Sequence, residues 1–135
     1  MREILFRGKR TDGKGWIEGL PTYLTEYAKD MNEIDGIQCN RTRFNYDIHF
    51  ETVGQYTGLT DKNGVKVFEG DILYAKYEDT QEEKGYYEVY DEVVFKNGAF
   101  GLIGETTGDL LSFDYLPIVN EVVCGNIYDN KELLK

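Results

Sequence analysis

Residues 51–77 read ETVGQYTGLTDKNGVKVFEGDILYAKY, and this stretch decides the fold. Its start alternates as a short strand does, and Val65 begins a second strand. Between them, Asn63-Gly64 favours a turn because both residues tolerate a positive φ. The second strand is interrupted by Glu-Gly-Asp at 69–71, which predicts a bulge or a corner, and it then continues to Tyr77.

Outside this stretch the strongest pattern is a hairpin at the start of the chain. Residues 3–10 form one expected strand and residues 16–24 the other, joined by a turn at Asp12-Gly13. A polar, acidic loop is expected after residue 77. Residues 37–50 are expected to form a strand or an ordered loop, and further strands are expected at residues 86–96, 99–104, 110–115 and 121–128.

Two short helical segments are also expected. Residues 25–32 predict a helix with Thr25 as its N-cap, which Gly36 ends. Near the C-terminus, Asp129 or Asn130 suits the cap of a single helical turn. Together these patterns predict a mainly-β fold: an antiparallel barrel or sandwich with a short C-terminal helical turn and one short helix near 25–32.

Length and composition limit the class of protein. A chain of 135 residues predicts one domain, over residues 1–135. No apolar run is long enough to span a membrane, and the charged N-terminus lacks the apolar segment of a secretory signal. Cys39 and Cys124 are too few for a disulfide framework, so we expect free thiols and a cytoplasmic protein.

The net charge of −10 is unevenly distributed. Residues 1–20 carry five basic and three acidic side chains, whereas residues 78–95 carry seven acidic side chains against Lys84 alone. An overall negative field repels phosphates and argues against general nucleic-acid binding.

The sequence offers little catalytic chemistry. His49 is the single histidine and Ser112 the single serine, so neither a zinc site nor a Ser-His-Asp triad can be assembled from the usual residues. Glu69 and Asp71 could share a strand face as an acid–base pair, but capping of backbone N–H groups is the favoured role. We therefore expect a non-enzymatic protein with no catalytic residues, metal or cofactor.

Asp61 begins a segment that partly matches a calcium-binding loop. The glycine comes two residues too early, and Ile72 stands where the loop needs Glu. A turn is the favoured interpretation.

Residues 74–92 interleave tyrosines with carboxylates, which is typical of an interaction surface. Tyrosine supplies contact area at a low entropic cost, and carboxylates steer a basic partner. The alternative is a solvated hairpin with an acidic loop. The predicted surface for a protein partner consists of Tyr77, Glu82, Glu83, Tyr86, Tyr87, Glu88, Tyr90 and Asp91.

A second hypothesis is nucleic-acid binding by a small barrel, and a third is mimicry of DNA by spaced acids. The second would use the basic N-terminal hairpin, in which cations lie near an aromatic side chain. A homo-oligomer is also left open, and no membrane partner is expected. The residues of the basic hairpin are Arg2, Arg7, Lys9, Arg10, Lys14 and Trp16.

Three blocks of the sequence resemble the YopX family of phage and prophage proteins. The first is FRGKR at 6–10 with GWIEG at 15–19; the second is VGQYTGLTDKNG at 53–64 with VFEGDI at 67–72; the third is VCGNIYDNKELL at 123–134. Lys131 stands where a proline is more usual. The resemblance implies a complex β-barrel-type fold and a phage or prophage setting in the bacterial cytoplasm. It implies no catalytic residues and no ligand.

Overall fold

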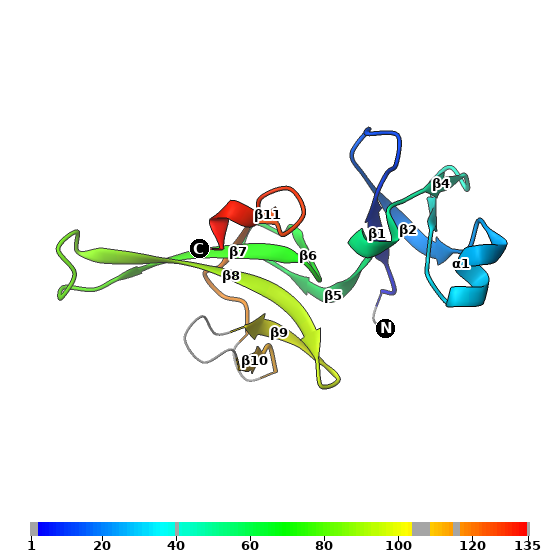
Figure 1. The fold of residues 1–135 in the computed structure, drawn as a ribbon. Coiled ribbons are helices and arrows are strands. Elements are labelled where there is room, and N and C mark those ends of the chain that lie inside the picture. Colours follow the sequence, from blue (N-terminus) through cyan, green and yellow to red (C-terminus); the bar gives the residue numbers. More distant parts are fainter. Residues whose placement is uncertain (1–2, 40, 104–108, 115–116, 135) are drawn as a thin grey trace. The chain divides into compact units, whose positions relative to one another are not determined.

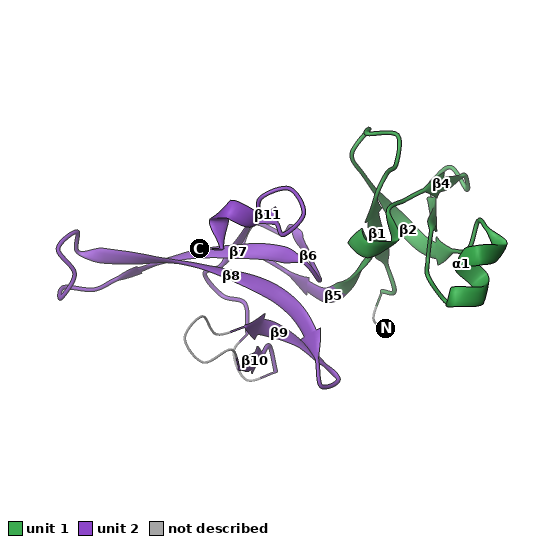
Figure 2. Ribbon diagram, in the orientation of Figure 1, with its two compact units in different colours: residues 1–56 green, residues 57–135 purple. Residues whose placement is uncertain are grey.

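The computed structural model describes residues 3–39, 41–103, 109–114 and 117–134 of the chain. The chain divides into two compact units, Met1–Tyr56 and Thr57–Lys135 (Figure 2). The prediction of one domain over residues 1–135 stays a prediction beside this division. Figure 1 labels the strands, which are β1 (Phe6–Lys9), β2 (Trp16–Thr22), β3 (Gly36–Cys39), β4 (Asn45–Asp47), β5 (Gly54–Thr60), β6 (Lys66–Phe68), β7 (Asp71–Glu78), β8 (Tyr86–Lys96), β9 (Ala99–Ile103), β10 (Leu110–Ser112) and β11 (Val122–Asn126).

The mainly-β, antiparallel prediction is confirmed. One sheet has the strand order β4-β3-β2-β1-β5-β6, and the other has the order β10-β9-β8-β7-β11. Of the two predicted architectures, a closed barrel is not formed by the described strands, which make two separate sheets instead. No helix in the described part of the chain is long and apolar enough to cross a membrane.

The predicted N-terminal hairpin is confirmed as β1 and β2, paired in the register Lys9↔Trp16. Its turn is closed by the Arg10 N–H, which donates to the Gly15 carbonyl at 2.8 Å. Within the turn the Asp12 carboxylate accepts the Lys14 N–H at 3.0 Å. These short-range bonds explain why the hairpin could be predicted from local sequence.

The predicted helix is confirmed as α1 (Glu26–Met31), and the Thr25 hydroxyl caps it by accepting the Ala28 N–H at 3.1 Å. The predicted end of this helix was wrong. Asn32, with a φ of 58°, adopts the left-handed conformation that ends a helix, and Gly36 instead begins β3.

The predicted strand at residue 51 begins later than expected. Phe50–Thr52 form the single 3-10 turn η1, and β5 starts at Gly54. The reason is long-range, because the Thr52 hydroxyl accepts the Lys9 N–H at 2.9 Å and donates to the His49 carbonyl at 2.6 Å. These two bonds hold the backbone in a turn where the sequence alternates like a strand.

The Asp61 turn is confirmed, and its aspartate is almost fully buried. One carboxylate oxygen accepts the N–H groups of Asn63 and Val65, and the other accepts the Val123 N–H at 2.9 Å. Burial alone would raise the pKa of Asp61, but these three hydrogen bonds outweigh it and hold the pKa below its ordinary value of 3.8. The carboxylate thus ties the β5–β6 turn to β11.

The Glu-Gly-Asp corner is also confirmed. Gly70 has a φ of 91°, and Asp71, which is only 1% exposed, accepts the Phe68 N–H at 2.7 Å. Asp71 therefore caps the corner between β6 and β7, as the favoured interpretation of the sequence predicted. Behind this corner, the core of the second unit is built on the buried side chains Val67, Leu73, Val93 and Phe113.

The C-terminal helical turn is confirmed as η2 (Lys131–Leu133), and Asn130, one of the two predicted caps, stands at its N-cap position. Asn130 precedes η2 without a side-chain cap bond. Its side-chain Oδ1 accepts the Asn126 N–H at 3.2 Å instead. The same oxygen lies 2.5 Å from the position that a Cβ on Gly125 would take. Asn130 is thus used to close the turn after β11.

Candidate functional site

The acidic, tyrosine-rich stretch forms the outer part of the β7–β8 hairpin in the second unit. β7 and β8 pair from Ile72↔Glu92 to Glu78↔Tyr86. The neighbouring strands do not follow the hairpin outward, since β11 pairs with β7 no further than Tyr74, and β9 pairs with β8 only from Val93 onward. We call residues 74–92 the acidic ribbon; Figure 1 shows it extending beyond β9 and β11.

One face of the acidic ribbon carries the even-numbered side chains, because residues paired across two strands share a face. The rings of Tyr74 and Tyr90 lie 5.2 Å apart. Further out, the Lys76 amine lies 3.9 Å from the ring centroid of Tyr86. Burial, together with a hydrogen bond to Glu88, raises the pKa of Tyr74. This face combines aromatic rings, a carboxylate and a cation already bound over a ring.

The opposite face carries the odd-numbered side chains and is partly covered. The rings of Tyr77 and Tyr87 lie 5.4 Å apart. The Tyr77 hydroxyl donates to the Glu121 carboxylate at 3.1 Å, and burial and this bond raise the pKa of Tyr77. Asp91 pairs with Leu73 nearer the core. Tyr77 is therefore used partly within the fold.

The eight residues predicted as one partner surface are thus divided. Tyr86, Glu88 and Tyr90 point to one face, and Tyr77, Tyr87 and Asp91 to the other. The period of two in a strand could have predicted this division. Glu82 and Glu83 lie in the loop that joins the strands.

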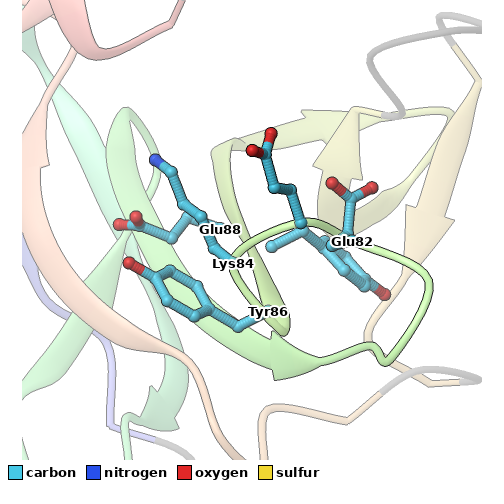
Figure 3. Close-up of a pocket in the computed structure, with 6 residues that line it drawn as sticks. Glu82, Lys84, Tyr86 and Glu88 are labelled. Atoms are coloured by element: carbon cyan, nitrogen blue, oxygen red, sulfur yellow. The ribbon is translucent and has the colours of Figure 1, made fainter.

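The loop of the acidic ribbon has a defined geometry. The Asp79 N–H donates to the Gly85 carbonyl at 3.0 Å, and the Asp79 carboxylate accepts the Gln81 N–H at 2.9 Å. Beside the loop lies a hollow of about 270 Å³ (Figure 3). Its lining residues are Glu82, Glu83, Lys84, Tyr86, Tyr87 and Glu88.

The side chains around this hollow point in different directions. In Figure 3, Lys84, Tyr86 and Glu88 extend to one side of the hairpin, and Glu82 extends to the other. The three glutamates leave the lining net negative despite Lys84. The lining of the hollow thus combines carboxylates, two aromatic rings and one lysine, drawn from both faces of the hairpin.

Two neighbours of the predicted surface were missed by sequence reasoning. Lys76 lies opposite Glu88, and hairpin register alone could have found it. Glu121 bonds to Tyr77 across 44 residues, and no local signal predicts this contact. At the base of the acidic ribbon, burial and the nearby Glu69 raise the pKa of Glu92.

The basic hairpin uses its arginines within the first unit. The Arg7 guanidinium lies 4.8 Å from the ring centroid of Trp16, and that of Arg10 lies 4.6 Å from the ring centroid of Tyr46. Arg10 also pairs with Asp12 at 2.5 Å. Lys14 is exposed, Lys9 is half-buried, and Arg2 lies outside the described residues. The ring face of Trp16 expected to stack on bases already carries a cation.

The remaining polar candidates are not part of the acidic ribbon. The His49 ring is 3.9 Å from the Glu51 carboxylate, and both side chains are exposed. Cys39 is buried and Cys124 exposed, and both are free thiols, as predicted. Among the described residues, no group of three or more His, Cys, Asp or Glu side chains could hold a metal ion.

Comparisons with known proteins agree with the three sequence blocks. A comparison with curated proteins returned no match. The fold is similar to the crystal structure of protein EF1440 from Enterococcus faecalis, with a TM-score of 0.61, 26% sequence identity and coverage of 100% of both chains. The model of the YopX protein family matches residues 5–135. The chain therefore belongs to the YopX protein family.

Proposed function

We propose that this chain is a non-enzymatic accessory protein of a phage or prophage, and that it binds a basic protein partner in the cytoplasm of a bacterial host. The observation that carries the proposal is the acidic ribbon. It has tyrosines on both faces and acidic side chains along its strands and loop, and it extends past its neighbouring strands.

Three properties of the acidic ribbon support this function. Tyr87 is 43% exposed, so aromatic area is available for contact. Glu82, Glu83 and Glu88 are exposed carboxylates that would attract a cationic surface. The internal hydrogen bonds of the loop reduce the entropy that would be lost when a partner binds.

The basic hairpin supports its alternative function less well. Arg7 and Arg10 lie over aromatic rings, and Arg10 is also paired with Asp12. Cations held in this way contribute less to phosphate binding than exposed ones. We therefore propose the protein-binding function alone.

The test is affinity capture from a bacterial host lysate with three immobilised proteins. One is the unaltered chain, and one carries Glu82→Lys, Glu83→Lys and Glu88→Lys. The matched control carries Asp30→Lys, Asp47→Lys and Glu132→Lys, at exposed acids away from the acidic ribbon. Both variants move the net charge by the same six units, from −10 to −4.

The expected result is a basic protein retained by the unaltered chain and by the control, and lost by at least about tenfold from the ribbon variant. Retention of every captured protein by the ribbon variant would remove the proposed surface. Equal loss from both variants would assign the binding to net charge alone and would also contradict the proposal.

A further inference from the structure

Within the described part of the chain, the outer edge of β8 has no paired strand along most of the acidic ribbon. β8 pairs with β7 through residues 86–92, and β9 joins its other edge only at residues 93–96. Among the described strands, none pairs with that outer edge over residues 86–91, and Ile103, which ends β9, follows in register opposite Glu92. A strand edge of this length is a template for a further strand.

The hydrogen-bonding phase of the hairpin identifies the outward groups. Residue pairs in an antiparallel ladder alternate between bonded and non-bonded. The Asp79 N–H donates to the Gly85 carbonyl, so the bonded pairs continue through Tyr87, Val89 and Asp91. The intervening residues therefore direct their backbone groups outward: Tyr86, Glu88, Tyr90 and Glu92.

A second bond agrees with this phase. The Val93 carbonyl accepts the Gly70 N–H at 2.9 Å, so this odd-numbered residue also directs its carbonyl toward the β7 side. Beyond it, the edge is taken by β9, which pairs at Val94↔Gly101 and Lys96↔Ala99. The outward groups at residues 86–92 thus continue the edge that β9 already uses.

We propose that this edge binds an extended, basic segment of the partner protein as an added antiparallel strand. The inference rests on the proposed function and specifies how the partner is held. Main-chain bonds would supply affinity, and alternate side chains would supply specificity. The four outward residues, which place their side chains on one face, read Tyr-Glu-Tyr-Glu along β8.

This pattern defines the chemistry of the added strand. Residues directly opposite each other on paired strands share a face, and opposite charges there are stabilising. Lys or Arg at every second position would meet Glu88 and would lie beside the rings of Tyr86 and Tyr90, whereas the position opposite Glu92 belongs to Ile103 of β9. The Lys76 amine over Tyr86 is an example of such a contact within the chain.

A second copy of this chain fits the edge less well. Pairing two copies would bring together two strands that each carry Glu88, Asp91 and Glu92, and like charges across strands are destabilising. Charge complementarity therefore selects a basic segment over self-association.

The experiment uses the full chain and the seven-residue peptide Lys-Thr-Lys-Thr-Lys-Thr-Lys. When the peptide lies along the open edge, three of its lysines face Tyr86, Glu88 and Tyr90 and direct their N–H groups toward β8. One variant peptide has N-methyl groups on three lysines, and its matched control has them on the three threonines. An otherwise identical peptide with Glu in place of Lys tests the sign of the charge.

We expect N-methylation of the lysines to weaken binding by at least about tenfold, and N-methylation of the threonines to change it by less than about threefold. Glu88→Lys should weaken binding by a similar factor of about ten, whereas Glu78→Lys, one strand further away on β7, should have less than about a threefold effect.

Amide hydrogen exchange gives a direct readout. In the free chain, Tyr87, Val89 and Asp91 should be protected, and the outward residues Tyr86, Glu88 and Tyr90 should exchange quickly. The peptide should slow exchange at the outward residues alone. Protection of those residues in the free chain would mean that a second copy occupies the edge, and this would overturn the inference.

The two proposals fail differently. If the Lys peptide binds, but both N-methylated peptides bind equally and the outward amides gain no protection, the added strand is wrong and the basic-partner function stands. If the Lys peptide binds no better than the Glu peptide, both proposals are overturned.

Discussion

Two antiparallel hairpins of opposite charge can be compared in this chain. The basic β1–β2 hairpin has strands on both sides, because β3 pairs with β2 and β5 pairs with β1. Among the described strands, those that pair with the acidic β7–β8 hairpin do so near its base. Both hairpins contain a cation over an aromatic ring, but these contacts lie in different surroundings.

The difference teaches that residue type alone does not separate a structural contact from a binding surface. Arg10 lies over Tyr46, its side chain is 21% exposed, and it joins the turn of the hairpin to β4. Lys76 lies over Tyr86 on a ribbon with open edges, and it is exposed. A contact between strands that are paired on both sides is structural, whereas a contact on a strand with an open edge can belong to a binding surface.

The largest expected effect comes from matched glycine substitutions. A Cβ on Gly19 of β2 would lie 1.9 Å from the Gln38 carbonyl oxygen, whereas at Gly85, with a φ of 81°, nothing lies within 4 Å. We expect Gly19→Ala to lower the free energy of unfolding by about 3 kcal/mol or more, and Gly85→Ala by about 1 kcal/mol. Urea denaturation measures both, and equal losses would contradict the contrast between a crowded and an open hairpin.

The cation contacts should differ by a smaller amount. Arg10→Met removes a half-buried guanidinium from Tyr46 and Asp12, and it should cost about 1–2 kcal/mol. Lys76→Met on the acidic ribbon should cost about 0.5 kcal/mol, because that contact is solvated. Unfolding midpoints at a constant denaturant slope check the order. A larger loss for Lys76→Met would reverse the roles assigned to the two hairpins.

The two hairpins should respond to opposite ends of the pH scale. Hydrogen bonding from the Lys14 N–H and the nearby Arg10 hold the pKa of Asp12 below its ordinary 3.8, despite the opposing effect of partial burial. The stability that Asp12 contributes is therefore present above that value and is lost as pH falls through the lowered pKa.

Tyr77 has the opposite sign. Burial and the bond to Glu121 raise its pKa above the ordinary 10.0, so its contribution is present below that value and is lost as pH rises through the raised pKa. Melting temperatures measured across pH should fall less steeply at acid pH in Asp12→Asn than in the unaltered chain. They should fall less steeply at alkaline pH in Tyr77→Phe. If the melting temperatures of both variants depend on pH as those of the unaltered chain do, this assignment is contradicted.

The smallest expected effect is at the loop of the acidic ribbon. Glu82 and Glu83 are exposed, so Glu82→Lys with Glu83→Lys should change the free energy of unfolding by no more than about 0.5 kcal/mol. Urea denaturation of this variant and of the unaltered chain measures the difference in the free energy of unfolding. A loss of several kcal/mol would make these acids structural and would weaken the case for a binding surface.

Local sequence chemistry predicted a large part of the fold. The Thr25 cap, the turns at Asp12 and Asp61, and the Asp71 corner all depend on hydrogen bonds within a few residues of the chain. Such short-range bonds can be read from residue type and spacing. The tyrosines and acids of the candidate surface were found from composition in the same way.

Contacts between distant residues were not predictable. Thr52 bonds to the Lys9 backbone across 43 residues, and this bond turns an expected strand into η1. A local contact can be equally ambiguous: the Asn130 side chain bonds to Asn126, four residues earlier, instead of to the N–H groups of η2, and nothing in the spacing distinguishes the two uses. Long-range partners compete with local preferences and decide the outcome where those preferences are weak.

By itself, the sequence determined the YopX family, the mainly-β class and the two oppositely charged hairpins. Only the tertiary structure decided that the strands form two sheets, and that the Tyr77 hydroxyl donates to Glu121, 44 residues away. It also decided that β9 leaves β8 at Val93. The physical reason is that charge and strand propensity belong to each residue, whereas an open strand edge depends on where every other strand has paired.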